Sequence, residues 1–469
     1  MRECLVLPHG LTVLLAWAAG AAHAQPCAPY WDPTIGVPGM DGLVDALCVF
    51  DNATGQPLYA GGFFTSAGGL PANKIAKRDG QTWSALGDGM LGFYPNSLVR
   101  VEALDVFDDG TGPALYAGGA FEFAGGVRTT GIARWDGKSW SGLDGGLGWV
   151  NALCVFDDGA GPALYAGGYI RESYGASNRP LSGIAKWDGR IWSPLGLGIG
   201  GRGYASGPGV VALAVFDDGT GPALYAGGEF TLAGGAPANN IAKWDGRGWW
   251  PLGQGLTGYV AYVNALAIYD DGTGPALYVG GGFTYAGGQP ANSIARWNGV
   301  TWSPVAQGTV GVVDALAVFA DGTSRDSWLY ADGWWQTGEP GGPHRVARWD
   351  GVAWRALTDG PDWAVFAMEP QQVPSATRAA VLTMGGEFTR VGEAVANRLA
   401  AWQGCVFADL DGDEDVDLGD FVIFQQCYAG SGNPPAPTCP PGVDADFDDD
   451  GDVDLADFLI FQQNFTGSG

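Results

Sequence analysis

The chain has 469 residues and a formal net charge of −27 at pH 7. Its length is enough for two or three domains, and a hydrophobic content of 46% is enough to build a large core. The negative charge argues against nucleic acid or an anionic membrane surface as a partner, because like charges repel.

Residues 1–24 have the features of an export signal. Arg2 gives a basic start, residues 11–22 form an apolar run, and Ala22-His23-Ala24 is an A-x-A cleavage sequence. The run is too short to span a membrane comfortably. We therefore expect a secreted protein in the extracellular space, at the cell surface or in the periplasm, where disulfides form.

One sequence module then recurs along the chain. Its clearest copy includes Tyr225-Ala-Gly-Gly-Glu-Phe-Thr, and the Tyr of this motif recurs at intervals of 49 to 60 residues. Each copy contains four strand signals joined by Asp-Asp-Gly and Asp-Gly turns. Seven copies, the last one degenerate at Thr383, predict an all-β fold: a seven-bladed β-propeller over residues 25–404. A solenoid is the alternative, but it needs polar end caps that we do not find in the sequence.

The two ends of the repeat region predict how the ring closes. The seventh copy stops at residue 404 without a fourth strand, and Trp31-Asp-Pro-Thr-Ile-Gly36 resembles the missing strand. We expect this N-terminal strand to complete the last blade and so to remove two exposed sheet edges. Cys27 and Cys405 flank this junction, and a disulfide between them would contribute about 4–5 kcal/mol on the chain-entropy model.

The pattern Tyr-Ala-Gly-Gly-Glu-Phe-Thr, Ile-Ala-Lys-Trp-Asp-Gly and Trp-x-Pro-Leu-Gly resembles kelch-like and especially Rax2-like propeller repeats, over about residues 40–404. The resemblance implies a propeller with an extracellular binding role and no particular ligand. Blades 3 and 6 depart from the pattern in the same loop, and loops at one face usually carry recognition. The candidate ligand-binding residues, with plain loop variation as the alternative, are therefore Arg171, Glu172, Tyr174, Trp334, Trp335 and His344.

The repeated residues are expected to have structural roles. The Asp-Asp-Gly loops offer too few carboxylates for calcium and are expected to be surface turns. The tryptophan of the third strand is expected to pack between blades, with a sugar-stacking ladder as the alternative. The basic residue before it is expected to be solvated or ion-paired, and the polar residue before the third strand to bond loop backbone. Cys48 and Cys154 are expected to be small buried thiols.

Histidine is too scarce for most catalytic centres. Of three histidines, two lie in the signal, which leaves His344. A Ser-His-Asp triad would need this residue, and metal centres with several histidines are excluded. A pair of carboxylates for glycoside hydrolysis stays open.

The composition changes at Cys405. Residues 405–469 contain fifteen Asp or Glu and no Lys or Arg. A disordered acidic tail would lack aromatic residues. This segment instead has phenylalanines at helical spacing, which predicts amphipathic helices lined by Phe421, Phe424, Phe458, Phe461 and Phe465.

A twelve-residue acidic loop occurs twice in this segment, 37 residues apart. Carboxylates fall at positions 1, 3, 5, 9 and 12, and position 7 offers its backbone carbonyl, which is EF-hand-type spacing for calcium. Without metal the carboxylates would repel one another, so the loops should order on binding. The predicted ligands are Asp409, Asp411, Asp413, Asp415, Asp417 and Asp420 in the first loop, and Asp446, Asp448, Asp450, Asp452, Asp454 and Asp457 in the second.

Aspartate at position 12 and the tandem loop-plus-helix form resemble type I dockerin repeats, over residues 409–465. The resemblance implies two Ca²⁺ sites and docking through helix faces to a cohesin-like or other surface protein. Position 6 is Gly451 in the second loop but Glu414 in the first, so the first loop is expected to bind more weakly. Cys427 and Cys439 flank the Pro-rich link between the loops and are predicted to form a local disulfide.

These observations favour a secreted, non-catalytic binding or scaffold protein. Its propeller would present a face to a glycan or protein ligand, and its small α-helical domain, residues 405–469, would attach it to a partner in a calcium-dependent manner. A dockerin-bearing carbohydrate-active enzyme and a structural surface protein are the alternatives.

Overall fold

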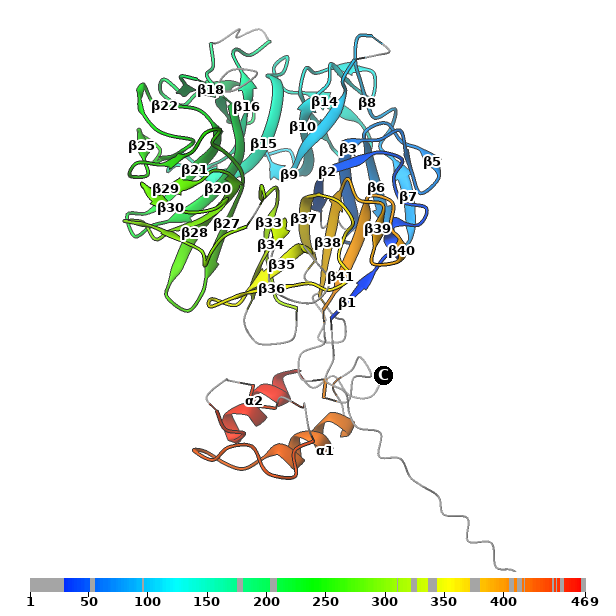
Figure 1. The fold of residues 1–469 in the computed structure, drawn as a ribbon. Helices are drawn as coiled ribbons and strands as arrows, with labels where there is room; N and C mark the ends of the chain where they lie inside the picture. The colour runs from blue at the N-terminus through cyan, green and yellow to red at the C-terminus, as the bar shows by residue number, and fades with distance from the viewer. Residues whose placement is uncertain are drawn as a thin grey trace, which may run out of the picture. The chain divides into compact units, whose positions relative to one another are not determined.

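The structure is a computed structural model. It describes residues 29–50, 55–94, 97–174, 180–202, 209–309, 311–321, 327–335, 344–371, 380–404, 409–410, 416, 418–440, 443, 445–447 and 451–464. For Trp334, Trp335, His344, Gln463 and Asn464 it describes the backbone alone. Two compact units contain Ala28–Phe407 and Ala408–Gly469 (Figure 1).

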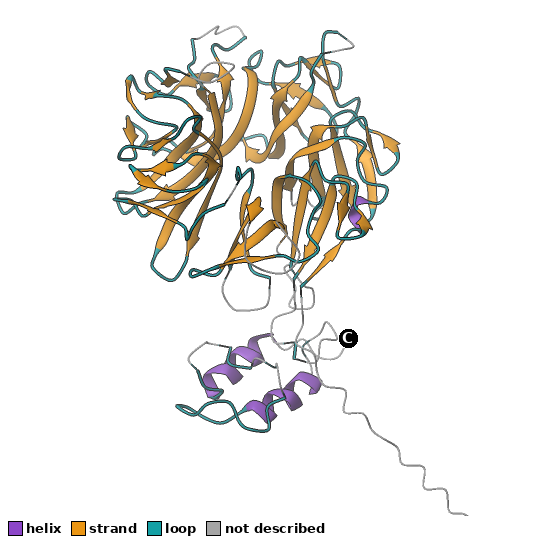
Figure 2. Cartoon of the chain, in the orientation of Figure 1, coloured by secondary structure: helices purple, strands orange, loops and turns teal. Residues whose placement is uncertain are grey.

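The first unit is built from seven four-stranded antiparallel sheets, which confirms the predicted β-propeller (Figure 2). Blade 1 consists of β2 (Leu43–Val49), β3 (Leu58–Phe63), β6 (Ile75–Asp79) and β7 (Thr82–Ala85). Blade 2 consists of β9 (Arg100–Asp108), β10 (Pro113–Ala120), β13 (Ile132–Trp135) and β14 (Trp140–Gly142). Blade 3 consists of β15 (Gly148–Asp157), β16 (Pro162–Ile170), β17 (Ile184–Trp187) and β18 (Trp192–Pro194).

Blade 4 consists of β20 (Gly209–Asp217), β21 (Pro222–Glu229), β24 (Ile241–Trp244) and β25 (Trp249–Pro251). Blade 5 consists of β27 (Tyr262–Asp270), β28 (Pro275–Gly282), β31 (Ile294–Trp297) and β32 (Trp302–Pro304). Blade 6 consists of β33 (Leu316–Phe319), β34 (Trp328–Trp335), β35 (His344–Trp349) and β36 (Trp354–Ala356). Blade 7 consists of β37 (Val365–Gln371), β38 (Val381–Gly386), β41 (Leu399–Gln403) and, from the other end of the chain, β1 (Tyr30–Asp32).

The first strand of each blade contacts the first strand of the next. These contacts run from β2 through β9, β15, β20, β27, β33 and β37 and return to β2. The seven inner strands therefore form a closed ring, as a propeller requires and an open solenoid does not.

The N-terminal strand closes the last blade as predicted. Trp31 is paired with Trp402, in the same register as Trp187 with Trp192 in blade 3. The strand is short, because a 3-10 turn, η1 (Thr34–Gly36), follows it. The proposed Cys27–Cys405 disulfide lies outside the described residues.

Tryptophans join neighbouring blades. The third-strand Trp of a blade packs against its fourth-strand partner, with ring centroids 5.2 Å apart for Trp135 and Trp140. In blades 2 to 5 the fourth-strand Trp donates its indole N–H to a carbonyl of the preceding blade, at 2.9 Å from Trp140 to Leu86. Trp31 does the same to the Thr358 carbonyl at 3.0 Å. Inter-blade packing is therefore the role of these residues.

The other repeated side chains also have structural roles. In blade 4, the Asp218 carboxylate accepts the Tyr225 hydroxyl at 2.8 Å and pairs with Lys243 at 2.5 Å. Equivalent ion pairs join Arg134 to Asp109, Lys186 to Asp158, Arg296 to Asp271 and Arg348 to Asp321. The polar residues before the third strand bond loop backbone, as Asn239 does to the Gln254 carbonyl at 2.9 Å.

The first glycine of each Tyr-Ala-Gly-Gly motif lies against the next blade. At Gly227, an added Cβ would be 2.4 Å from a methyl group of Val263, and five further blades have the same arrangement. Blade 6 has Asp332 at this position, with no exposed surface. Neither carboxylate oxygen of Asp332 has a hydrogen bond of normal geometry. Burial raises the pKa of Asp332 well above its usual value, and the nearby N–H groups of Val365 and Gly333 offset this only in part.

Small accessory strands flank the blades. Most form hairpins in the loops between the second and third strands, and in three of the connections from one blade to the next a single strand pairs with the hairpin of the following blade. The accessory strands are β4 (Ser66–Ala67) and β5 (Leu70–Pro71); β8 (Met90–Leu91), β11 (Phe123–Ala124) and β12 (Val127–Arg128); β19 (Ile199–Gly200), β22 (Leu232–Ala233) and β23 (Ala236–Pro237); β26 (Leu256–Thr257), β29 (Tyr285–Ala286) and β30 (Gln289–Pro290); and β39 (Arg390–Val391) and β40 (Ala394–Val395). In the described parts of blades 3 and 6 this hairpin is absent, which fits their departure from the repeat.

Candidate metal centre

The second unit contains two helices of equal length, α1 (Leu418–Cys427) and α2 (Leu455–Asn464). Each helix begins at position 10 of its acidic loop. The helices pack through the predicted phenylalanines, with ring centroids 5.6 Å apart for Phe424 and Phe461 and 5.8 Å apart for Phe421 and Phe458. The aromatic spacing therefore encodes a small core, and Phe465 lies outside the described residues.

Both acidic loops are closed by the same hydrogen bond. The carboxylate at position 12 accepts the backbone N–H of position 2, from Leu410 to Asp420 at 2.5 Å and from Phe447 to Asp457 at 2.5 Å. Both aspartates have no exposed surface. Burial fixes these carboxylates at the start of each helix, where the helix dipole stabilises negative charge.

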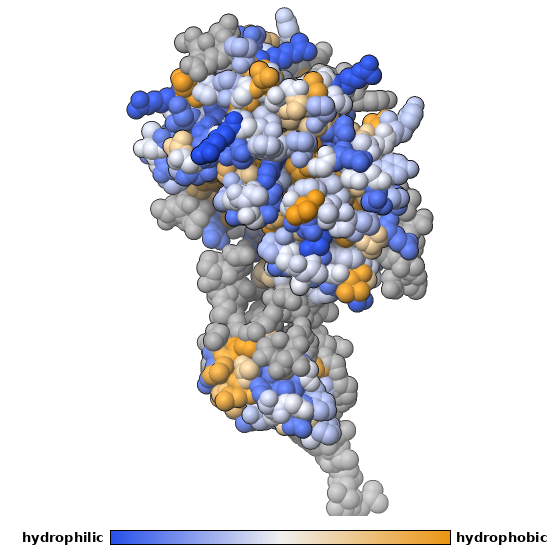
Figure 3. Space-filling model, turned by 90° about the vertical axis from the view of Figure 1, so that its left-hand side faces the viewer, coloured by the Kyte–Doolittle hydropathy of each residue, from blue (hydrophilic) through white to orange (hydrophobic). Residues whose placement is uncertain are grey.

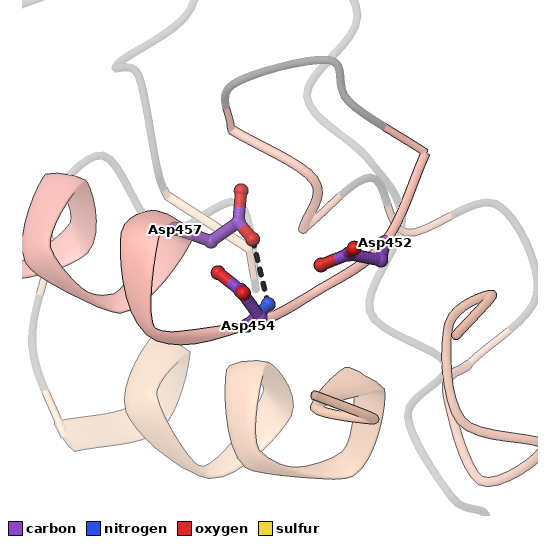
Figure 4. A group of neighbouring side chains, drawn as sticks. All are labelled: Asp452, Asp454 and Asp457. Carbon is purple, nitrogen blue, oxygen red and sulfur yellow. Dashed lines mark hydrogen bonds between the residues drawn. The ribbon is translucent and has the colours of Figure 1, made fainter. Parts of the chain in front are cut away.

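The second loop brings three carboxylates together. Oxygen atoms of Asp452, Asp454 and Asp457 all lie within 4.8 Å of one another (Figure 4). The Asp457 carboxylate also accepts the Asp454 N–H at 2.7 Å, and Asp452 accepts the Gly432 N–H at 2.5 Å. Three acidic groups this close repel one another, and a divalent cation with oxygen ligands would relieve the repulsion.

The glycine at position 6 of this loop has the conformation expected of it. Gly451 has a φ of +92°, which disfavours residues with a side chain. Its N–H donates to Asp446 at position 1, at 2.8 Å, which folds the loop back on itself. Position 7 was expected to offer its backbone carbonyl, and in the structure it is the carboxylate of Asp452 that joins the group.

The link between the loops is tied down at two points. Cys427 at the end of α1 and Cys439 form a disulfide. The carbonyl of buried Val453, at position 8 of the second loop, accepts the N–H groups of Ala429 and Gly430 at 3.0 Å. The segment after the first helix therefore braces the second loop.

Half of the predicted ligands lie within the described residues. Asp409 of the first loop is described and buried, together with Asp420. The remaining predicted ligands lie outside the described residues: Asp411, Asp413, Asp415, Asp417, Asp448 and Asp450.

The candidate ligand residues on the propeller are in two separate blades. In blade 3, Arg171, Glu172 and Tyr174 are exposed, and the Tyr174 N–H bonds the Gly146 carbonyl at 3.0 Å. In blade 6, the backbones of Trp335 and His344 are paired across β34 and β35. Blades 3 and 6 are not neighbours in the ring, so these residues form two groups.

Ionisable residues on the inner strands were missed by the sequence reasoning. Glu369 and Asp105 occupy a repeat position that Ala214, Ala267 and Ala317 hold elsewhere, which is the signal that could have found them. Burial, reinforced by Asp105, raises the pKa of Glu369 to about 7, although the Val49 N–H donates to it at 2.9 Å. Burial also raises the pKa of Asp105 to about 6.

Two thiols share this repeat position. Cys48 and Cys154 are free, the first buried and the second half-buried. Burial raises the pKa of the Cys154 thiol to about 12. These thiols are therefore protonated and unreactive at neutral pH.

No protein-family model and no curated protein matches the sequence. Solved structures with similarity include the extracellular domain of the one component system BT4673 from B. thetaiotaomicron, with 11% identity and a TM-score of 0.42 over 81% of this chain and 40% of that chain. An ancestral GH74 enzyme has 12% identity and a TM-score of 0.42, over 78% of this chain and 48% of that chain. The GH74 enzyme of Niastella koreensis has 16% identity and a TM-score of 0.31, over 74% and 41%. The chain thus spans less than half the length of these structures.

One structural feature bears on the compartment in which the protein folds. The Cys427–Cys439 disulfide is consistent with an oxidising, extracytoplasmic compartment. Among the described residues, no helix has the length and apolar character needed to cross a membrane.

Proposed function

We propose that this chain is an exported, non-catalytic binding or scaffold protein, in which a calcium-dependent dockerin-like module attaches a ligand-presenting propeller to a partner. The observation that carries the proposal is the pair of matching acidic loops, each closed by its position-12 aspartate onto the N–H of position 2. A duplicated geometry of this kind is difficult to explain as a solvated acidic tail, because it buries carboxylates that a tail would expose.

The donor set suits calcium. Ca²⁺ takes six to eight oxygen ligands, mostly from carboxylates and carbonyls. The second loop offers Asp452, Asp454 and Asp457 within 4.8 Å of one another, and the described donors include neither imidazole nor thiolate in this group. The first loop repeats the buried aspartate at position 12 and also buries Asp409 at position 1, so we infer a second, weaker site there.

Each helix also presents an exposed apolar pair. Leu418 and Val422 of α1 have 68% and 54% of their surface exposed, and Leu455 and Leu459 at the equivalent places of α2 have 59% and 51%. Figure 3 shows hydrophobic side chains gathered on part of this unit. Exposed apolar patches of this kind mark protein–protein contacts, which supports a cohesin-like or other surface protein as the partner.

Calcium titration followed by far-UV circular dichroism tests the module. We expect helix content to rise on adding Ca²⁺, and Asp457→Asn to remove the second-site transition while Asp420→Asn removes the first. Glu393→Gln, an exposed carboxylate on the propeller, is the charge-matched control and should behave as the wild type. A spectrum unchanged by calcium, or two transitions retained in Asp457→Asn, would contradict the proposal.

A further inference from the structure

The outer strand of blade 4 breaks the repeat at one residue. β25 has Trp250 directly after the tryptophan that joins the blades. The equivalent residue is serine in four other blades, at Ser84, Ser141, Ser193 and Ser303. Trp250 is paired across the sheet with Lys243, as these serines are with their basic residues. A large aromatic side chain therefore replaces a small one at a site where the backbone is unchanged.

The Trp250 ring is both exposed and fixed in orientation. It has 54% of its surface exposed. Its indole N–H donates to Asp245 Oδ2 at 2.8 Å. An exposed aromatic residue held by a hydrogen bond loses little conformational freedom when a ligand stacks on it.

Trp250 lines a cavity of about 450 Å³. The cavity lies between the first turn of blade 4, its outer strands and the Gly299 turn of blade 5, and its polar lining includes Thr220, Lys243 and Asp245. This volume is within the range of sites for small ligands, about 300–1,000 Å³.

The polar groups around the ring retain capacity for a ligand. Lys243 Nζ donates to Asp218 Oδ2 at 2.5 Å and to Thr220 Oγ1 at 3.0 Å, which leaves one of its three N–H donors. Asp245 Oδ1 accepts the Arg247 and Gly248 N–H groups, both at 2.8 Å, which fixes the carboxylate while lone pairs remain on Oδ2. One donor and one acceptor are thus held at the rim of an aromatic surface.

We propose that the Trp250 cavity is a binding site for a neutral saccharide. The flat C–H face of a pyranose ring would stack on the indole, and its hydroxyl groups would pair with Lys243 and Asp245. A cationic ligand would meet Lys243 and an anionic one would meet Asp218 and Asp245, so the mixture of charges favours an uncharged, hydroxyl-rich ligand. The inference deepens the proposed function, on which it rests for the ligand-presenting role of the propeller.

Binding of the full-length mature chain to an array of neutral oligosaccharides that includes cellohexaose, xylohexaose and mannohexaose tests this proposal. We expect binding by the wild type and a roughly tenfold or greater loss of affinity in Trp250→Ser, since aromatic contacts contribute on this scale. Serine occurs here in four other blades, so the variant should keep the fold, which its melting temperature checks.

Trp363→Ser is the matched control. Like Trp250, Trp363 is exposed, with 52% of its surface accessible, and its indole N–H donates to a carboxylate, that of Glu387, at 2.8 Å. Its ring, however, is stacked against a charged group, because the Arg345 guanidinium lies over it at 5.2 Å from the ring centre. We expect this variant to bind as the wild type does. An array without signal, undiminished binding by folded Trp250→Ser, or an equal loss in Trp363→Ser would overturn the proposal.

Repeating the array with a calcium chelator separates the two proposals. We expect saccharide binding to persist without calcium, because the Trp250 cavity lies in the propeller. A silent array beside an intact calcium response would overturn the saccharide site alone. Chelator-resistant binding beside an absent calcium response would support the saccharide site and overturn the calcium module alone.

Discussion

The N-terminal strand should contribute measurably to the stability of the whole ring, and Trp31→Ala is the substitution that tests it. Trp31 donates its indole N–H to the Thr358 carbonyl of blade 6 at 3.0 Å, and its ring lies edge-on to Trp402 at 5.0 Å. The hydrogen bond contributes about 1 kcal/mol and the aromatic pair about 1 kcal/mol. Loss of the half-buried indole surface adds a similar amount, so we expect a loss of about 3 kcal/mol.

Equilibrium unfolding of the mature chain in urea measures this loss. Trp302→Ala, which removes the equivalent residue from blade 5, should cost a comparable amount. Val37→Ala, at a residue with 56% of its surface exposed just after the strand, should change stability by less than about 0.5 kcal/mol. If Trp31→Ala proved as mild as Val37→Ala while Trp302→Ala was costly, the N-terminal strand would not close the ring.

Two carboxylates of the blades, half-buried Glu369 and buried Asp332, predict how stability depends on pH. With a pKa of about 7 in the fold and 4.5 in the unfolded chain, Glu369 keeps its proton longer when folded, so the free energy of unfolding should fall as pH rises from about 4.5 to 7. Glu369→Gln should remove this fall and stabilise the protein by up to about 3 kcal/mol at pH 8 but not at pH 4. Urea unfolding measures this difference, and equal stability of variant and wild type at pH 8 would refute the prediction. Asp332→Asn should stabilise by about 1–3 kcal/mol at high pH, because it removes a buried charge; thermal melts at pH 5 and pH 9 check this, and no growth of the difference with pH would count against it.

The repeat made much of the propeller predictable from the sequence. Six copies have a tryptophan in their fourth strand, and the seventh copy lacks this strand. The matching tryptophan at the N-terminus, Trp31, was enough to predict the strand that closes the ring. The ion pairs were harder to specify, because the partner of a basic residue such as Lys243 lies in a turn 25 residues earlier, at Asp218. The sequence left solvation and ion pairing open as alternatives and did not indicate which carboxylate would pair.

The sites were less predictable where one residue departs from a repeated pattern. Trp250 stands beside another tryptophan, and only the fold shows that Trp249 is half-buried and bonds the preceding blade while Trp250 is exposed over a cavity. Asp332 replaces a glycine, and its burial depends on how blade 7 approaches it. In the second acidic loop, the spacing predicted the positions of the ligands, but whether Asp452 turns its carboxylate inward depends on its bond to Gly432.

Isothermal titration of the full-length mature chain with Ca²⁺ tests the central claim most directly. We predict two bound ions per chain, with the tighter site lost in Asp457→Asn and the weaker site lost in Asp420→Asn. The absence of binding heat together with an unchanged melting temperature in millimolar calcium, or a stoichiometry unaffected by either substitution, would contradict the calcium-dependent module.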